Sequence, residues 1–157
     1  MEGHNFEQLK AHILPLSQSN NFNIARTEWD LVGVEISDEI DNCPCGQVIK
    51  EHCYIRNRLT GSGTFVGNVC INRFMQIDTG NLFDGLKRIA SDDTANANHD
   101  LIEYAFRKGY LFGENEYNFL KQTVLKRKLS LAQIKWKQKI NRRIINKTIV
   151  RRRSELL

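Results

Sequence analysis

The sequence is poor in the features that mark secreted and membrane-spanning proteins. It contains no run of about 18 apolar residues that could span a bilayer. The first ten residues include Glu2, His4, Glu7 and Lys10 and contain no apolar run, so we expect no signal peptide. The apolar fraction of 41% and the charged fraction of 26% are typical of a folded protein. We therefore expect a folded protein of the cytoplasm, or of the nucleus if the source has one.

The sequence also lacks the short motifs of common enzyme classes. It contains no G-x-x-x-x-G-K, G-x-G-x-x-G, H-E-x-x-H or G-x-S-x-G, and no zinc-deaminase pattern of H-x-E followed by P-C-x-x-C. The pairs Asp92-Asp93 and His99-Asp100 are typical of loops and helix starts. Carboxylates that converge only in the fold would leave no such motif. We expect a protein that is not an enzyme, with a metal-dependent nuclease as a minor alternative.

Acidic residues are absent from one long segment near the end of the chain. Between Lys126 and Arg153 there are twelve lysines and arginines and no aspartate or glutamate, which leaves 11 basic and 18 acidic residues elsewhere. A cationic arm on an acidic body is typical of a protein that binds phosphate or an acidic partner. The alternative is a solvated helix whose basic face folds back onto the body.

The apolar pattern predicts an α+β fold, with a small β region followed by a helical half. Phe6–Leu16 has helical spacing and ends near Pro15. Strands are predicted at Trp29–Ile36, Gln47–Arg58 and Thr64–Gly67, and residues 37–42 as a connection. Further helices are predicted from about Val69 and at 82–90, 99–108, 114–126 and 130–152, with Gly109 and Gly113 as helix stops and a capping box at Ser130 and Gln133. The corresponding regions are residues 1–28, an N-terminal helix and loop; 29–78, a zinc-binding β region; and 79–157, a helical region that ends in a basic helix.

All four cysteines lie within 28 residues, in the spacing C-x-C-x7-C-x16-C: Cys43, Cys45, Cys53 and Cys70. Zinc prefers four tetrahedral ligands, and four thiolates form a closed structural site without an open position for catalysis. The Cys43-Pro44-Cys45-Gly46 turn, a hairpin strand and a helix start would then converge on one ion, as in a zinc ribbon or treble clef. We expect one structural zinc whose binding energy is folding energy.

Three alternatives to the all-cysteine zinc site remain open. The first pair is C-x-C and not the usual C-x2-C, so His52 could replace one ligand; neighbouring residues of a strand point to opposite faces, however. Disulfides are a second alternative, which the expected reducing compartment disfavours. Buried free thiols are the third.

Residues 29–75 resemble a four-cysteine zinc module of small proteins from bacteriophages, mobile elements and large DNA viruses. The resemblance rests on the segments around the cysteines: Trp29–Val32, Cys43–Ile49, Cys53–Asn57, Val66–Ile71 and Phe74. The stretch from Phe119 to Trp136 is similar to helical segments beside phage DNA-metabolism proteins. The resemblance implies a role in nucleic-acid transactions or in host–virus conflict, and it brings no specific activity.

Two surfaces are candidates for nucleic-acid contacts. If Cys53 and Ile55 face the zinc, then Lys50, His52, Tyr54 and Arg56 share the opposite face of the strand, where a tyrosine and cations could stack a base and hold phosphates. The last helix is the second surface, with candidates at Lys135, Lys139, Arg142, Arg143, Arg151, Arg152 and Arg153. For the strand the simpler alternative is a packed tyrosine beside solvated cations.

The last helix carries two apolar stripes on roughly opposite sides. Ala132, Trp136, Ile140 and Ile144 form the first, and Leu131, Ile134, Ile145 and Ile149 the second. Such a helix is clamped between two neighbours, bends near Asn141–Asn146, or uses one stripe in a homo-oligomer.

These patterns favour a zinc-stabilised nucleic-acid-binding accessory protein of replication, recombination or transcription. The alternative is a protein-interaction module that inhibits or adapts a host complex, in which the acidic body could imitate nucleic acid. Neither hypothesis includes a membrane partner.

Overall fold

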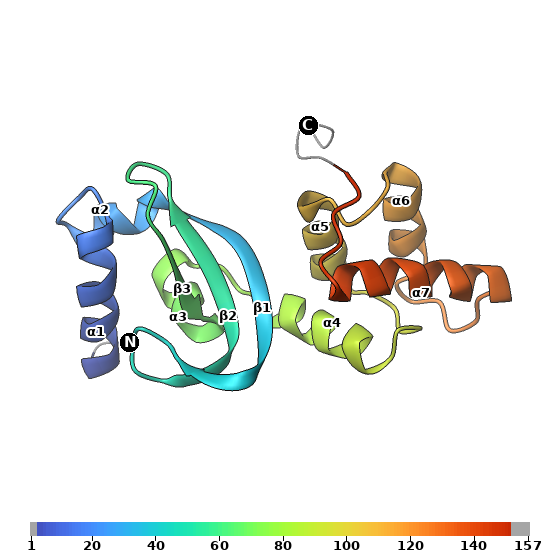
Figure 1. The fold of residues 1–157 in the computed structure, drawn as a ribbon, viewed down its shortest axis with the longest axis horizontal. Coiled ribbons are helices and arrows are strands. Elements are labelled where there is room, and N and C mark those ends of the chain that lie inside the picture. The colour runs from blue at the N-terminus through green and yellow to red at the C-terminus, as the bar shows by residue number, and fades with distance from the viewer. Residues whose placement is uncertain (1–2, 152–157) are drawn as a thin grey trace. The chain divides into compact units, whose positions relative to one another are not determined.

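The computed structural model describes residues 3–151 and contains an α+β fold. The part of the chain that it describes holds one antiparallel sheet of three strands and seven α-helices, in the order α1, α2, β1, β2, β3, α3, α4, α5, α6, α7 (Figure 1). The chain divides into two units, residues 1–79 and 80–157. The first unit includes both the N-terminal helix and the β region, for which the sequence predicts a boundary at residue 28.

The sheet of the first unit has the order β1–β2–β3, with β2 in the centre. Strand β1 (Trp29–Asn42) pairs with β2 (Val48–Asn57), which pairs with β3 (Gly63–Gly67). The predicted end of β1 at Ile36 is wrong, because the strand resumes pairing at Asp41 after a register shift. The irregular stretch from 37 to 40 carries the polar residues that suggested a connection. This extension brings the end of β1 to the first cysteine.

One face of the sheet is covered by helices and forms the core of the first unit. Helix α3 (Asn68–Met75) packs against β2 and β3. Helix α1 (His4–Ile13) buries Leu9 and Ile13, and the short helix α2 (Phe22–Ala25) leads into β1. Phe74 of α3 lies at the centre of this core, with its ring 6.4 Å from that of Trp29. Side chains along β2 point alternately to the two faces of the sheet. Cys53 and Ile55, two residues apart, are therefore both buried on the face that the helices cover.

A buried glutamate, Glu28, joins the start of β1 to the loop after α1. Its carboxylate accepts hydrogen bonds from the backbone amides of Gln18 and Ser19 at 2.8 and 3.0 Å and from Asn57 Nδ2 at 2.9 Å. The hydrogen bond from Asn57 and those from the two amides lower the pKa of Glu28 against the opposing effect of burial. We expect Glu28→Ala to leave three donors without an acceptor and so to destabilise the first unit, which a lower urea denaturation midpoint would show. An unchanged midpoint would contradict this role.

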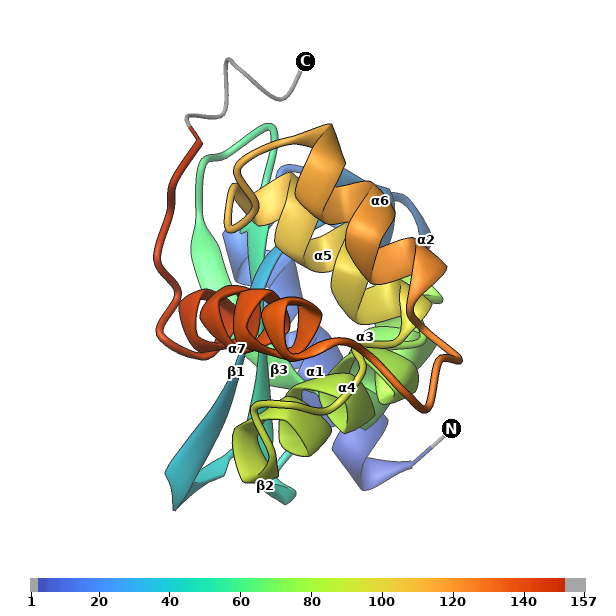
Figure 2. The same cartoon turned by 90° about the vertical axis from the view of Figure 1, so that its right-hand side faces the viewer.

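The second unit contains helices and loops but no strand in its described residues, 80–151. Helix α4 (Gly80–Ser91) packs against α5 (His99–Lys108) and α7 (Leu131–Ile145), and α5 packs against α6 (Glu114–Gln122) (Figure 2). The predicted helix stop at Gly109 is confirmed, with a left-handed φ of 80°. The capping box at Ser130 and Gln133 is confirmed as well.

Helix α7 ends seven residues earlier than the sequence predicts. Asn146 is its C-cap and Lys147 has a left-handed φ of 54°, which turns the chain out of the helix. The backbone amides of Val150 and Arg151 then donate to Gly109 O at 2.8 and 3.1 Å. A Cβ on Gly109 would collide with the carbonyl oxygen of Arg151, so the glycine that ends α5 also permits this return.

Candidate metal centre

Two of the four cysteines sit in a tight turn between β1 and β2. The backbone amide of Gly46 donates to Cys43 O at 2.7 Å, and the amide of Cys43 donates to Gln47 O at 2.8 Å. Gly46 has a φ of 97°, a conformation that favours glycine. The turn therefore holds the side chains of Cys43 and Cys45 on the same side of a short loop.

The third cysteine comes from the first turn of α3. Gly67 ends β3 and precedes this helix, and its backbone amide donates to Cys43 Sγ at 3.3 Å. A Cβ on Gly67 would lie 2.9 Å from Cγ2 of Ile49, so the close approach of β3 to the start of β2 requires a glycine. The strand end and the helix start together bring Cys70 to the turn.

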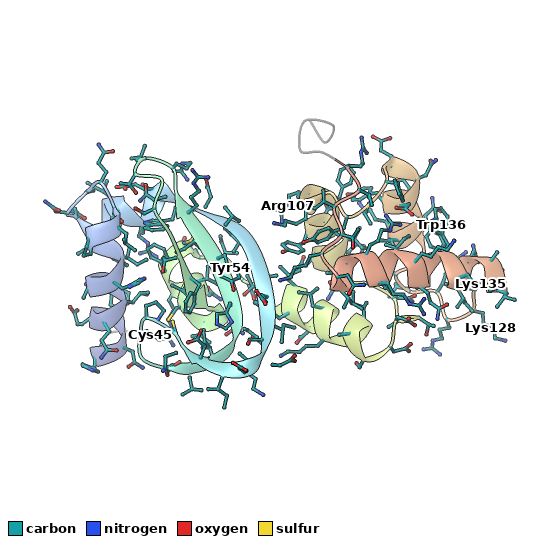
Figure 3. The ribbon with its side chains drawn as sticks, in the orientation of Figure 1. Cys45, Tyr54, Arg107, Lys128, Lys135 and Trp136 are labelled. Carbon is teal, nitrogen blue, oxygen red and sulfur yellow. The ribbon has the colours of Figure 1, made fainter. Side chains whose placement is uncertain are left out.

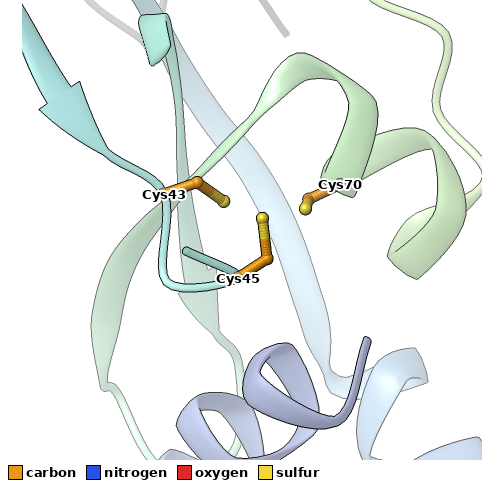
Figure 4. Close-up of side chains that lie close together, drawn as sticks. All are labelled: Cys43, Cys45 and Cys70. Atoms are coloured by element: carbon orange, nitrogen blue, oxygen red, sulfur yellow. The ribbon is translucent and has the colours of Figure 1, made fainter. Parts of the chain in front are cut away.

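Cys43, Cys45 and Cys70 form a buried cluster of thiols. Their Sγ atoms all lie within 4.8 Å of one another, and the three residues are at most 2% exposed and form no disulfide. Figure 4 shows the three side chains pointing toward one another from the turn and from α3. Such a cluster of soft ligands could hold a metal ion.

The three thiols do not ionise alike. The hydrogen bond from the Cys70 thiol lowers the pKa of Cys43 to about 5 against the effect of burial, with further contributions from Cys45 and the Gly67 amide. The same hydrogen bond, together with burial, raises the pKa of Cys70. The cluster therefore favours a thiolate at Cys43 that accepts hydrogen bonds from the neighbouring thiols. A divalent cation that bound here would displace the protons of those thiols.

Cys53 was expected as a fourth ligand, but it lies outside this cluster. It is buried in the middle of β2 on the core face, and its Sγ lies 4.0 Å from Thr79 Oγ1. Burial raises the pKa of the Cys53 thiol to about 12. The physical reason is position along the strand, because β2 begins at Val48 and Cys53 pairs with Val34 and Val66 in the interior of the sheet. The structure thus brings together three of the four cysteines.

His52, the alternative ligand, belongs to the opposite face of the sheet. Its Nε2 lies 3.1 Å from Asp41 Oδ2, and its ring centroid is 4.8 Å from that of Phe65. This placement follows from strand alternation and separates His52 from the thiol cluster.

Helix α1 approaches the cysteine turn, a contact that no pattern in the sequence predicts. The Gln8 side chain lies against Gly46, where an added Cβ would come within 2.6 Å of Gln8 Oε1. One helical turn later, burial lowers the pKa of His12, and the charge of the nearby Cys43 offsets only part of this effect. His12 Nε2 also lies 2.7 Å from Thr64 Oγ1. His12 lies 31 residues before Cys43 and belongs to no metal-ligand spacing motif. Its position near the cysteine turn therefore could not be predicted from the sequence.

The predicted strand surface contains aromatic side chains together with both signs of charge. Lys50, Tyr54 and Arg56 are all exposed. The hydroxyl of Tyr54 donates to Glu35 Oε2 at 3.0 Å, and its ring packs near those of His52 and Phe65. Burial and the neighbouring Glu35 carboxylate raise the pKa of Tyr54. The acidic neighbour weakens the attraction of this face for phosphate.

The predicted cations of α7 fall into two groups. Lys135 and Lys139 are exposed, and neither has an acidic partner within residues 3–151. Arg142 Nε pairs with Asp93 Oδ2 at 2.8 Å, and Arg143 Nη2 pairs with Glu116 Oε2 at 2.6 Å. Arg151 is half-buried, and Arg152 and Arg153 lie outside the described residues. Figure 3 shows Lys128 and Lys135 near the N-terminal end of α7.

The two apolar stripes of α7 have different surroundings. Ile140 and Ile144 of the first stripe are buried, and Trp136 stacks on Phe119 at 4.2 Å between ring centroids. Leu131 and Ile149 of the second stripe are 68% and 64% exposed.

Comparison with known proteins assigns neither a family nor a fold relative to this chain. No protein family, curated protein or solved structure matches the chain. The resemblance to proteins of phages and large DNA viruses therefore stays an expectation.

No helix among residues 3–151 combines the length and the apolar character needed to cross a bilayer.

Proposed function

We propose that this chain is a zinc-stabilised nucleic-acid-binding accessory protein, acting in replication, recombination or transcription. In this proposal Cys43, Cys45 and Cys70 hold zinc and fix the β-hairpin to α3, in an arrangement like a treble clef or zinc ribbon. Three buried thiols within 4.8 Å support a soft divalent ion, and zinc is the usual occupant of such thiolate sites. The ion has a structural role, and the proposal assigns the chain no catalysis.

A cationic surface of the second unit carries the nucleic-acid part of the proposal. It consists of exposed lysines and arginines on α7 and the loop before it: Lys126, Arg127, Lys128, Lys135 and Lys139. None of the five has an acidic partner in the described part of the chain. Unpaired exposed cations release counterions when they meet a phosphate backbone, which favours binding at low salt.

We expect the double substitution Lys135→Gln, Lys139→Gln to weaken nucleic-acid binding and its salt dependence together. Each lost phosphate contact reduces the slope of log K against log salt by about 0.9 for duplex DNA and about 0.7 for a single strand. The double variant should therefore lose about 1.4–1.8 units of slope. Fluorescence anisotropy with labelled single- and double-stranded DNA and RNA, over a series of salt concentrations, measures this change and identifies the preferred substrate.

The matched control removes two exposed charges from other helices, by Arg73→Gln in α3 and Arg88→Gln in α4. Both double variants lower the net charge equally. If the control reduced the salt slope as much as the α7 variant, binding would depend on net charge and not on this surface. Wild-type protein that bound none of the four substrates at low salt would exclude the proposal.

A protein-interaction module is the second candidate, favoured by the exposed apolar residues Leu131 and Ile149. Leu131 lies at the start of α7 and Ile149 beyond its end, and exposed large apolar side chains occur in interaction surfaces. Light scattering after size exclusion would detect a homo-oligomer, and Leu131→Asp should then convert it to a monomer. A monomeric wild-type protein that also recovers no partner from a host lysate would count against this role.

A further inference from the structure

The second unit contains a cavity of about 500 Å³ between α7, the loop before it and the segment before α5. Lining residues include Asn96, Leu129, Ile134 and Lys137. Its volume falls within the range of about 300–1,000 Å³ that is usual for small-molecule sites. The cavity lies entirely within one unit and is separate from the cysteine cluster.

A buried lysine lines this cavity without a negatively charged partner. Lys137 is 2% exposed, and its Nζ donates to Asn96 Oδ1. No carboxylate pairs with it among residues 3–151. An ammonium group has three donors, and Asn96 Oδ1 is the one acceptor that Lys137 has in the described part of the chain. Burial alone lowers the pKa of Lys137, as expected for a cation that lacks a counter-charge.

The surrounding residues hold Lys137 in place. The Asn96 side chain, which accepts from Lys137, also donates through Nδ2 to the carbonyl oxygens of Val124 and Lys126 at 3.1 and 2.9 Å. One amide thus positions both the lysine and the loop that forms the cavity wall. Such a network fixes the donor before any ligand arrives.

All the charged side chains that line the cavity are basic. Lys126 and Arg127 line it together with Lys137, and both are exposed. None of the lining residues described by the structure is acidic. The nearby Asp93 is engaged elsewhere, by Gln138 at 3.0 Å and Arg142 at 2.8 Å. A site with one buried and two exposed cations favours an anion with several acceptor oxygens.

The apolar part of the lining restricts the class of ligand further. Val124, Leu125, Leu129 and Ile134 share the cavity with the three cations. A bare inorganic anion would leave this apolar surface without a partner, whereas a phosphate attached to an organic ring would contact both parts.

We propose that this cavity binds a nucleoside phosphate, with the phosphate group on Lys137 and the base or sugar against Leu129 and Ile134. The ligand is either a free nucleotide or the terminal phosphate and nucleoside of a nucleic-acid strand. The inference does not depend on nucleic-acid binding by the exposed surface of α7, because a free nucleotide satisfies the same site.

The test is calorimetric titration of the full-length protein with adenosine monophosphate, adenosine, and a short single strand with or without a 5′ phosphate. We expect the monophosphate to bind at least tenfold more tightly than adenosine, since the phosphate forms charge-assisted hydrogen bonds. A free-nucleotide site binds the monophosphate better than the phosphorylated strand, and a strand-end site does the reverse. Equal affinity for adenosine and the monophosphate, or binding of neither phosphate ligand, overturns the proposal.

Lys137→Met tests the role of the buried cation, because methionine keeps much of the length and removes the charge. We expect it to weaken monophosphate binding by about tenfold or more, while Lys87→Met, at an exposed position of α4 outside the cavity lining, leaves it within about twofold. Thermal denaturation of Lys137→Met checks that the second unit is folded. If Lys137→Met unfolds, the site is tested instead by the amide chemical shifts of the wild-type protein on addition of monophosphate. Shift changes confined to residues 94–97 and 124–137 support the site, and shift changes elsewhere overturn it.

Discussion

Removal of the metal is expected to unfold the first unit. Binding of structural zinc by small thiolate modules supplies about 10–16 kcal/mol, whereas a domain is stable by only about 5–15 kcal/mol in total. Without the ion, the hydrogen bonds that join the turn at Cys43–Gly46 to the start of α3 are those of the Gly67 amide and of the thiols, which are weak. A zinc-selective chelator should therefore abolish the dispersed amide signals of residues 3–79, and added zinc should restore them.

Substitution of single cysteines separates a ligand from a buried thiol. We expect Cys70→Ala to purify without metal and with the first unit unfolded. Cys53→Ala serves as the matched control, because Cys53 is equally buried but lies outside the cluster. It should retain the metal and cost about 1–2 kcal/mol, as the loss of a small buried side chain does. If Cys53→Ala lost the metal as completely as Cys70→Ala, Cys53 would be a ligand and the three-thiol centre would be incomplete.

The second large effect is expected at Glu116, which is 6% exposed within the helical unit. Its carboxylate accepts from Arg143 Nη2 at 2.6 Å, Trp136 Nε1 at 2.9 Å and the Phe112 amide at 2.8 Å. Glu116→Ala leaves the guanidinium of Arg143, whose side chain is 15% exposed, without its anion. Breaking one side of a buried pair costs about 3–5 kcal/mol, so urea denaturation should show a loss of that size in the second unit.

The control for Glu116 is Glu103→Ala, which removes a carboxylate from the same unit. Glu103 is about half exposed, pairs with Lys121 at 3.9 Å and accepts a hydrogen bond from the Tyr117 hydroxyl; because these contacts face solvent, its loss should cost only about 1 kcal/mol. Equal destabilisation by the two variants would contradict the role assigned to the buried pair.

The Glu116 pair also predicts a dependence of stability on pH. Burial would raise the pKa of Glu116, but the hydrogen bonds from Arg143, Phe112 and Trp136 outweigh it and hold the pKa below its ordinary value. A carboxyl group with a depressed folded pKa contributes its full stability above the unfolded pKa of about 4.3. That contribution is lost as the pH falls through the folded pKa. The acid loss of stability should be smaller in Glu116→Gln than in the wild type.

Local signals in the sequence foretold much of the fold. Gly109 ends α5 and Ser130 begins α7, as predicted, because glycine in a left-handed conformation and a side-chain cap act over a few residues. The α+β composition followed from the change of apolar period after Gly67. The predicted ends of β1 and α7 were wrong, because they depend on contacts with distant parts of the chain. These contacts are the strand pairing at Asp41 and the hydrogen bonds to Gly109 O.

The candidate sites depended more strongly on the fold. Cysteine spacing indicated a metal centre, yet it could not distinguish Cys70, at a helix start, from Cys53, in the middle of a strand. A count of basic residues could not show that Arg143 pairs with Glu116 or that Lys137 is buried beside Asn96. These pairings join residues 27 and 41 positions apart, and charge patterning carries no information on such partners.

The most direct test of the account is the metal content of the full-length protein and its X-ray absorption spectrum. We expect one zinc per chain, sulfur as the dominant ligand at about 2.3 Å, and loss of the metal in Cys70→Ala but not in Cys53→Ala. A chain that purifies without metal, and whose amide spectrum does not change when zinc is added, would contradict the central claim that Cys43, Cys45 and Cys70 form a metal centre.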